Sequence, residues 1–286
     1  MKITNKYGLP ESLVRAVQNH KHKSADYSAS MLTNSPRIVH LTRRHYHELE
    51  EDVSERIWAL LGTAVHGIIE GHEADNEIAE GYMEIEVLPG VRVSGHSDVY
   101  DYDTKTVSDY KVTSAYAIIY GSRDAEWEKQ LNVYKLLFEH TGFPVENLRI
   151  IAVLRDWSKT KAQRDGSYPQ VNVAVLPIRM KPLKDTIAWV RGRVELFEAH
   201  KETPDDELPA CTAEDRWQSP SKWALMKQGR KSAVKLYDTE QEAVDAITDS
   251  KHYIQERPSE PRRCMDYCAV APFCNQWQSM KHQYGG

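Results

Sequence analysis

Two strand-like runs separated by a short turn constrain the fold most. Val91–Asp101 and Thr106–Thr113 are rich in β-branched and aromatic residues, and Asp103-Thr104 lies midway between them. A hairpin with a two-residue turn at that point places Asp98 directly opposite Asp109, with Lys111 two residues further along the same face. Opposed carboxylates repel unless a cation lies between them, so this face is expected to be a site rather than ordinary packing.

The rest of the chain alternates between helical and strand-like periodicity. Helices are expected over Val53–Glu73, Ala125–Thr141 and Leu183–His200, and further strands over Tyr82–Val87, Leu148–Trp157 and Val171–Met180. This order predicts a mixed α/β (α+β) core in which helices flank a central mixed sheet.

An acidic segment with two prolines, Glu202–Pro209, is interpreted as a linker. It predicts a core over residues 1–201, with a helical N-terminal segment capped by Ser28 or Ser30. Residues 210–286 are expected to form a small ββαβ module followed by a cysteine cluster. The module's hairpin turns at Gln228-Gly229-Arg230, its helix covers Thr239–Ile247, and its last strand covers Tyr253–Glu256.

The predicted hairpin face carries the groups that phosphodiester hydrolysis needs. A hard cation such as Mg²⁺ is held by one or two carboxylates and activates a water, and a nearby ammonium stabilises the developing charge. Two pairs at helical i,i+4 spacing supplement these groups: His66 with Glu70, as possible metal or water-mediated ligands, and Gln130 with Tyr134, which can hold Lys111 or contact a nucleic-acid backbone. His96 falls opposite Lys111 in the expected register and competes with His66 as a nitrogen ligand.

The four cysteines of the chain point to a metal site. Three of them fall within eleven residues near the end of the sequence, and the fourth lies far upstream: Cys211, Cys264, Cys268 and Cys274. In a chain without an export signal this clustering favours a metal over disulfides. Both a tetrahedral Zn²⁺ and an iron–sulfur cluster use four thiolates.

Composition limits the partners. The chain has 286 residues and a formal net charge of −5, so a nucleic-acid surface must be local. The run from Arg216 to Tyr237 has no acid and mixes cations with aromatic rings, which suits single strands, although a solvated hairpin is the equal alternative. The candidate DNA contacts in it are Arg216, Lys222, Trp223, Lys227, Arg230 and Lys231.

Other signals are missing from the sequence. It has no apolar run of membrane-spanning length and no secretory leader, so a soluble cytoplasmic protein is expected. It also has no Gly-rich phosphate loop, so use of ATP is not expected.

Four short motifs together resemble the PD-(D/E)XK nuclease superfamily, in particular its RecB-type exonuclease branch. They are GTAVH at Gly62–His66, GHSD at Gly95–Asp98, DYK at Asp109–Lys111 and QLNVY at Gln130–Tyr134, in the family's order. The resemblance implies a restriction-endonuclease-like core. It also implies that His66, Asp98, Asp109 and the Tyr110 carbonyl bind Mg²⁺ or Mn²⁺. Lys111 would then be catalytic, and Gln130 and Tyr134 would be its supporting pair. Glu70 is a further candidate catalytic residue because it shares a helical face with His66.

The same resemblance implies a DNA exonuclease that acts on ends or single strands in replication, recombination or repair, as in stand-alone phage-encoded members. A structure-selective endonuclease, or an inactive DNA-binding subunit, are the alternatives. Several RecB-type nucleases bind a 4Fe–4S cluster through three C-terminal cysteines and a distant fourth. Here the distant Cys211 follows the core and Cys264 is separated from Cys268 by three residues, so zinc remains the alternative to a structural 4Fe–4S cluster.

Overall fold

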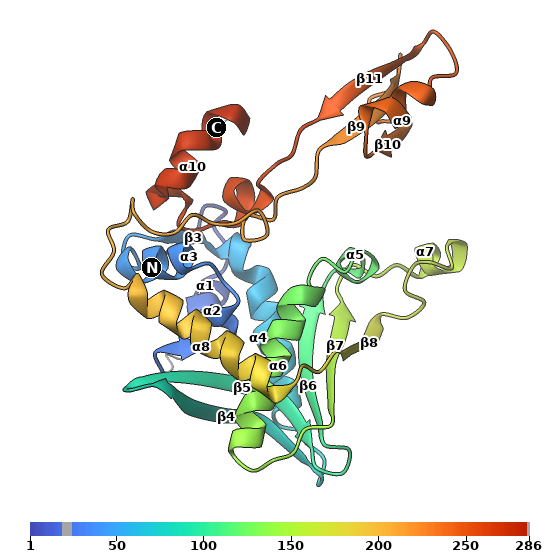
Figure 1. The fold of residues 1–286 in the computed structure, drawn as a ribbon. Helices are drawn as coiled ribbons and strands as arrows, with labels where there is room; N and C mark the ends of the chain where they lie inside the picture. Colours follow the sequence, from blue (N-terminus) through green and yellow to red (C-terminus); the bar gives the residue numbers. More distant parts are fainter. Residues whose placement is uncertain (19–24, 285–286) are drawn as a thin grey trace. The chain divides into compact units, whose positions relative to one another are not determined.

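The computed structural model describes residues 1–18 and 25–284, which form two compact units (Figure 1). Unit 1 comprises residues 1–34 and 47–202, and unit 2 comprises residues 35–46 and 203–286. The sequence analysis assigned residues 35–46 to the core, whereas their contacts place them with the C-terminal unit. The reason is that Arg37, on helix α3 (Pro36–Arg44), hydrogen-bonds to carbonyls of residues 205–209, a contact between distant segments that local periodicity does not predict.

Unit 1 is built on a six-stranded mixed sheet, as the alternating periodicity predicts. Strands β2, β5, β6, β7 and β8 are hydrogen-bonded in that order, and β4 also pairs with β5. The pairing of β6 with β7 is parallel, while β5–β6 and β7–β8 are antiparallel. The strands are β2 (Tyr27–Ser28), β4 (Glu77–Leu88), β5 (Val91–Asp101), β6 (Thr106–Thr113), β7 (Asn147–Leu154) and β8 (Val173–Ile178).

Helices cover this sheet. The long helices α6 (Asp124–His140) and α8 (Leu183–Ala199) pack against each other, and α6 lies over the sheet's strands while α4 (Ile57–Ile69) packs along β6 (Figure 1). Two short helices that the periodicity did not predict follow strand ends: α5 (Ala115–Ile119) comes after β6, and α7 (Lys159–Arg164) after β7.

The expected β5–β6 hairpin is present, with a longer loop. Val99 pairs with Ser108 and Asp101 with Thr106, which is the predicted register, but pairing stops there and leaves residues 102–105 as a four-residue loop instead of a two-residue turn. Lys105 takes a positive φ of 50°, and the Asp101 carboxylate accepts a 2.9 Å hydrogen bond from the Thr104 N–H, so the side chain of Asp101 stabilises the wider loop.

Aromatic side chains fill the core between sheet and helices. Tyr100 on β5 stacks on Phe138 of α6, with ring centroids 4.7 Å apart, and Tyr27 stacks on Phe197 of α8 at 5.1 Å. All four are almost completely buried. The Tyr27 hydroxyl donates to Glu198 at 2.6 Å, so the buried phenol keeps a hydrogen-bond partner.

The N-terminal residues form a smaller layer of unit 1. Strand β1 (Lys2–Thr4) pairs in parallel with β3 (Glu50–Asp52), and α1 (Glu11–Gln18) packs on α4. Helix α2 (Ala29–Leu32) is capped by Ser28, one of the two predicted caps, whose hydroxyl accepts from the Met31 N–H.

Unit 2 combines one helix from the first third of the chain with the C-terminal residues. Helix α3 (Pro36–Arg44) packs among the loops around residues 203–218, and the chain ends in a short helix, α10 (Asn275–Met280). Between them lies the predicted ββαβ module: β9 (Lys222–Lys227), β10 (Lys235–Tyr237), α9 (Glu240–Asp245) and β11 (His252–Arg257), in the strand order β10-β9-β11.

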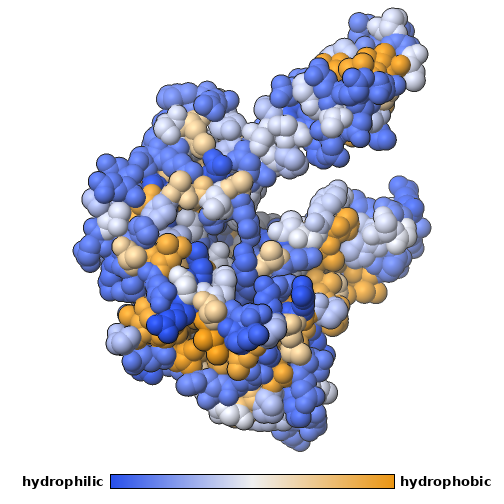
Figure 2. All heavy atoms as spheres, in the orientation of Figure 1, coloured by the Kyte–Doolittle hydropathy of each residue, from blue (hydrophilic) through white to orange (hydrophobic). Residues whose placement is uncertain are grey.

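The module is an insertion whose two ends meet. Gln218 forms a β-bridge with Pro261, and the Ser219 N–H donates to the Glu260 carbonyl at 3.0 Å. Figure 2 shows a patch of hydrophobic residues on the visible face of the module, bordered by hydrophilic ones. The large apolar side chains of the module that are exposed are Val234, Leu236, Val244, Ile247 and Tyr253.

The segment Glu202–Pro209 does not have the character of a free linker. The Asp205 carboxylate contacts Arg44 at 2.6 Å and His45 at 2.7 Å, and three carbonyls of the segment accept hydrogen bonds from Arg37. Acidic, proline-rich composition suggested a solvated connection, but α3 supplies cations that fix it. No helix in the described part of the chain is long and apolar enough to cross a membrane.

Candidate functional site

Asp98 lies where strands β5 and β6 separate. The residue pairs of the hairpin end at Val99–Ser108, one step before Asp98 and Asp109 would pair. The Asp98 Oδ2 instead accepts a hydrogen bond of 2.6 Å from the Tyr110 N–H. The Asp98 carboxylate therefore accepts the hydrogen bond of a β6 N–H in place of a β5 backbone carbonyl. Backbone pairing stops at this point, and the two strands separate next to the buried acids.

Asp109 is the more deeply buried acid, with 1% of its surface exposed. Lys111 Nζ lies 2.5 Å from Asp109 Oδ2, yet this oxygen has no partner with hydrogen-bond geometry. The pKa of Asp109 is raised to about 6, chiefly by burial; the Lys111 charge opposes this rise and the Asp98 charge contributes to it. The buried carboxylate of Asp109 is thus already held against one cation, the Lys111 ammonium.

Helix α4 brings His66 to this pair of acids, as its i,i+4 position suggested. His66 Nδ1 lies 2.8 Å from Asp98 Oδ1, and this hydrogen bond raises the pKa of His66 despite its partial burial. Glu70 is at the C-terminal end of the same helix, where its side chain is exposed. Its part in the site stays a prediction.

The glycine of the second motif has a steric reason. A Cβ at Gly95 would lie 2.4 Å from Leu137 Cδ1 and 2.9 Å from Tyr134 Cδ1, closer than packed carbons approach. Helix α6 therefore rests directly on the β5 backbone at Gly95. Gln130 Nε2 donates to the Tyr134 hydroxyl at 2.6 Å, so the predicted pair forms one buried unit above β5. The predicted contact of the Gln130–Tyr134 pair with Lys111 stays a prediction.

His96 lies on the same strand, with its ring 6.2 Å from that of Tyr82 on β4 and tilted by 55°. It is two residues from Asp98 and therefore on the same face of β5. The structure places His66, and not His96, in a hydrogen bond with a site carboxylate. Which histidine binds a metal stays a prediction.

The residues at the strand divergence fit a hard divalent cation. Mg²⁺ commonly uses one or two carboxylates and fills its other positions with water. Asp109 is buried against the Lys111 ammonium, and Asp98 lies beside it in the divergence. In the described part of the chain no three His, Cys, Asp or Glu side chains are already spaced as ligands of one ion. The two acids are the candidate ligands that lie together at the divergence, and the other ligands of the resemblance stay a prediction.

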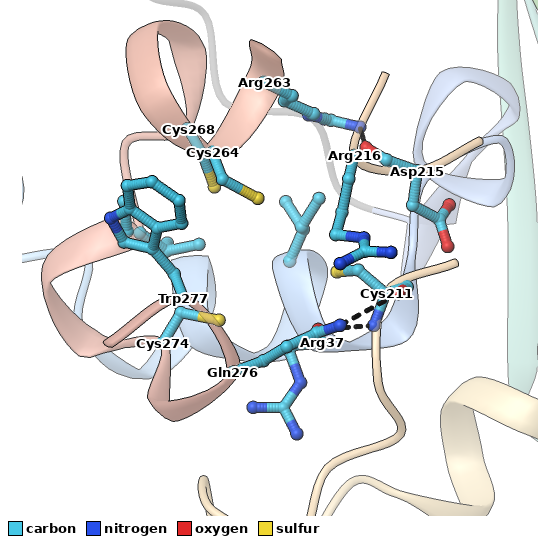
Figure 3. A pocket seen from close by; sticks show the side chains of 13 residues that line it. Arg37, Cys211, Asp215, Arg216, Arg263, Cys264, Cys268, Cys274, Gln276 and Trp277 are labelled. Carbon is cyan, nitrogen blue, oxygen red and sulfur yellow. Dashed lines mark hydrogen bonds between the residues drawn. The ribbon is translucent and has the colours of Figure 1, made fainter. Parts of the chain in front are cut away.

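The four cysteines line one cavity within unit 2 (Figure 3). Cys264 and Cys268 belong to the turn Arg263–Tyr267 and its end, Cys274 precedes α10, and Cys211 comes from the loop after residue 209. The structure thus brings the distant Cys211 to the three C-terminal cysteines.

Burial controls the ionisation of these thiols. It raises the pKa of Cys211 and of Cys264 to about 11, and also raises the pKa of Cys268. Because metals bind thiolates, loading this site must release protons. Three arginines line the same cavity, where their charge would compensate bound thiolates: Arg37, Arg216 and Arg263.

Arg37 is a residue of this site that sequence reasoning missed. It is 3% exposed and its guanidinium donates to the carbonyls of Pro209 (3.1 Å), Asp205 (3.3 Å) and Leu208, and to the Asn275 side chain. The Cys211 thiol is joined to the same helix through Ser35 Oγ at 3.3 Å. The sequence did contain one signal for Arg37: an arginine that lies among the apolar residues of a short helix.

The candidate nucleic-acid residues of unit 2 divide into two groups. Arg216 lies at the cysteine cavity and bonds the Thr212 carbonyl, so it is not part of the ββαβ module. Within the module, Lys222 pairs with Asp238, and Lys227 pairs with Asp249 at 3.1 Å. Trp223 is half-buried, whereas Arg230 and Lys231 are exposed at the hairpin turn. The cation run therefore meets acids from the following segments.

No protein-family model matches the chain, and no curated protein matches it. Several solved structures are similar to part of the chain, and two of them are described here. SSO0001 has 17% identity, 64% coverage of this chain, 83% of its own and a TM-score of 0.44. A phage-related exonuclease from Haemophilus somnus 129PT has 13% identity, 66% and 82% coverage and a TM-score of 0.29.

Proposed function

We propose that this protein is a metal-dependent nuclease that hydrolyses phosphodiester bonds in DNA. The observation that carries the proposal is the divergence of β5 and β6, where Asp98, Asp109 and Lys111 converge with His66 from α4. Burying two neighbouring carboxylates with one lysine costs stability. A site that binds a cation and a phosphate accounts for that cost.

The residues have distinct roles in this proposal. Asp98 and Asp109 would hold Mg²⁺ or Mn²⁺, with His66 and the Tyr110 carbonyl as further ligands. The bound metal would polarise the phosphate and activate water. The Lys111 ammonium, held next to Asp109, stabilises negative charge that develops on the phosphate oxygens. Gln130 and Tyr134 position β5 through the close contact at Gly95.

We further propose that the four cysteines hold a structural 4Fe–4S cluster. Zinc and a 4Fe–4S cluster both use four thiolates, and the four cysteines line one pocket together with Arg37, Arg216 and Arg263. The resemblance to RecB-type nucleases, several of which bind a 4Fe–4S cluster through three C-terminal cysteines and a distant fourth, favours the cluster. Ultraviolet–visible absorption and metal analysis of anaerobically purified protein test this, because colourless protein with one zinc per chain contradicts it.

The chemistry itself is tested by digesting end-labelled DNA. Wild-type protein should cleave single- or double-stranded DNA with Mg²⁺ or Mn²⁺ and without ATP, and Lys111→Ala should lose about 100-fold or more of that activity. Lys105→Ala is the matched control, since Lys105 lies in the loop of the same hairpin and pairs with Glu146. Absence of cleavage with either metal, or an unchanged Lys111→Ala variant, would contradict the proposal. An inactive DNA-binding subunit would then remain.

Substrate topology separates the two modes of cleavage. We propose an exonuclease, which degrades linear DNA from its ends and spares covalently closed circles. Rapid loss of closed circles would instead identify a structure-selective endonuclease on the same core. Both modes use the same residues, so this measurement refines the proposal without depending on the variants.

A further inference from the structure

An exposed group of aromatic rings and cations lies where strands β6 and β7 end in unit 1. We propose that these residues, Trp58, Tyr116, Tyr120, Arg155 and Lys161, form a binding surface for single-stranded nucleic acid. The term strand-end surface is used for them below. The inference rests on the proposed nuclease function and specifies its substrate as a strand with unpaired bases at this place.

The rings are exposed to an unusual degree. Tyr120 is 75% exposed, Trp58 55% and Tyr116 42%, although buried aromatic area stabilises a fold. Tyr116 and Tyr120 are an i,i+4 pair from α5, with ring centroids 6.1 Å apart and planes within 16° of parallel. Nearly parallel rings facing solvent offer the flat surfaces on which unstacked bases pack.

Cations are held against two of these rings. The Arg155 guanidinium lies 4.7 Å from the centroid of the Trp58 ring, and Lys161 Nζ lies 5.1 Å from that of Tyr116. Lys161 also donates to the Tyr116 hydroxyl at 3.1 Å. Alternating rings and positive charges match a single strand, in which bases and phosphates alternate. The positive charge of Arg155 and Lys161 suits the binding of a polyanion, and Lys159 and Arg164 on α7 add to that charge.

The backbone fixes this surface next to the nuclease residues. The Ala115 N–H donates to Asp156 at 2.7 Å, and the Arg155 N–H donates to the Thr113 carbonyl at 2.9 Å, so the ends of β6 and β7 are joined. The Asp156 carboxylate, the one acid between Arg155 and Arg164, keeps its charge in this hydrogen bond. Four cations of the same segment outnumber it, Arg155, Lys159, Lys161 and Arg164, so the segment is net positive.

The surface and the site share two elements. Lys111 and Tyr116 are five residues apart across the end of β6, and α4 carries both His66 and Trp58. Trp58 and His66 are eight positions apart on this helix, which corresponds to about 12 Å along its axis. A strand held on the rings would thus pass within a few nucleotides of Asp98 and Asp109.

Binding without cleavage tests the proposal. We would measure the fluorescence anisotropy of a 5′-fluorescein-labelled oligo(dT) in EDTA, using the full-length protein. Loss of stacking on one base costs about 1–3 kcal/mol, so Tyr120→Ala and Trp58→Ala should each weaken binding about 5- to 150-fold. Tyr120→Phe keeps the ring and should stay within about twofold of wild type. Tyr7→Ala removes a tyrosine of unit 1 that is 73% exposed, and should have no effect.

A second measurement does not depend on variants. An oligonucleotide containing bromodeoxyuridine, irradiated in complex with wild-type protein, should cross-link to peptides that contain Trp58, Tyr116 or Tyr120. Cross-links confined to other peptides, or oligo(dT) binding unchanged in both alanine variants, would overturn the proposal. Failure of the nuclease proposal has a different signature: ring-dependent binding with no cleavage in Mg²⁺ or Mn²⁺.

Discussion

The carboxylate site of unit 1 and the cysteine site of unit 2 are held in place by different kinds of structure. Asp98 and Asp109 lie on adjacent strands of a six-stranded sheet, and their positions follow from the register of the β5–β6 hairpin. The cysteines lie on loops and short turns that are joined by side-chain hydrogen bonds, above all those of Arg37. The first site is a property of regular backbone pairing, whereas the second depends on individual side chains.

This difference predicts where each site is vulnerable. Removal of a functional group from the sheet site should change chemistry while the fold persists, because backbone pairing carries the fold. Removal of one side chain from the cysteine site should loosen the unit itself. The predictions below test that contrast, from the largest expected effect to the smallest.

The largest effect is expected for Asp109→Asn on DNA cleavage. The substitution keeps the shape of the side chain but removes the charge that would bind the metal, so cleavage should fall about 10³-fold or more. Asp103→Asn is the matched control, because Asp103 is an exposed acid in the loop of the same hairpin. Initial rates on end-labelled DNA provide the measurement. Equal loss in both variants would show that the hairpin's charge in general, and not the buried acid, is responsible.

The same variant should stabilise the metal-free protein. The pKa of Asp109 is raised by burial to about 6, so at neutral pH folding keeps an unfavourable charge in the interior. The stability difference between variant and wild type should reach about 3 kcal/mol at most at pH 7 and shrink as the pH falls from about 6 toward 4, where wild-type Asp109 is protonated.

Urea unfolding in EDTA at several pH values measures this difference, and Mg²⁺ should reduce it by stabilising the wild type alone. A variant that is less stable than wild type at pH 7 would show that the Lys111–Asp109 contact outweighs the burial.

Arg37→Ala should damage unit 2 selectively. It leaves the carbonyls of Asp205, Leu208 and Pro209 without their donor, at a cost on the order of 3 kcal/mol. We expect faster proteolysis within residues 203–286 and loss of any bound metal, while the sheet of unit 1 stays protected. Arg37→Lys should not rescue it, since one ammonium cannot make these divergent contacts. Arg15→Ala, at an exposed pair with Glu11, serves as control.

Gly95→Ala tests the close approach of α6 to β5. The added methyl would overlap Leu137 and Tyr134, and relief of that overlap should cost about 1–3 kcal/mol. Gly81→Ala in the neighbouring strand is the control, because its nearest neighbour would be Ser97 Oγ at an ordinary 3.5 Å. Thermal unfolding of both variants gives the comparison, and equal melting temperatures would show that α6 can move away without cost.

The smallest effect concerns charge in the ββαβ module. Residues 218–260 contain seven Lys or Arg and seven Asp or Glu, so the module is neutral overall, unlike the strand-end surface. If Lys222 contacts phosphate, Asp238→Asn should release it and tighten oligonucleotide binding by about twofold to fivefold, with a steeper salt dependence. Glu240→Gln makes the same charge change outside that pair. Equal effects of both variants would indicate overall charge and not Lys222.

Local pattern was sufficient for the central part of the fold. The hairpin register, the Ser28 cap, the helices around His66 and Gln130, and the order of the ββαβ elements follow from periodicity of two or 3.6 residues, which depends only on neighbours in sequence. The hairpin loop was predicted too short, because the Asp101 side chain supports a wider turn.

Contacts between distant segments were not predictable in the same way. The sequence alone determined which residues can hold a cation and which can hold a cluster, because side-chain chemistry is local. Only the tertiary structure decided that β5 and β6 separate at Asp98, that Lys222 and Lys227 meet Asp238 and Asp249, and that Arg37 fixes the segment before Cys211. Each of these depends on packing between segments far apart in the chain, where hydrogen-bond geometry and burial select one arrangement among many that the sequence pattern permits.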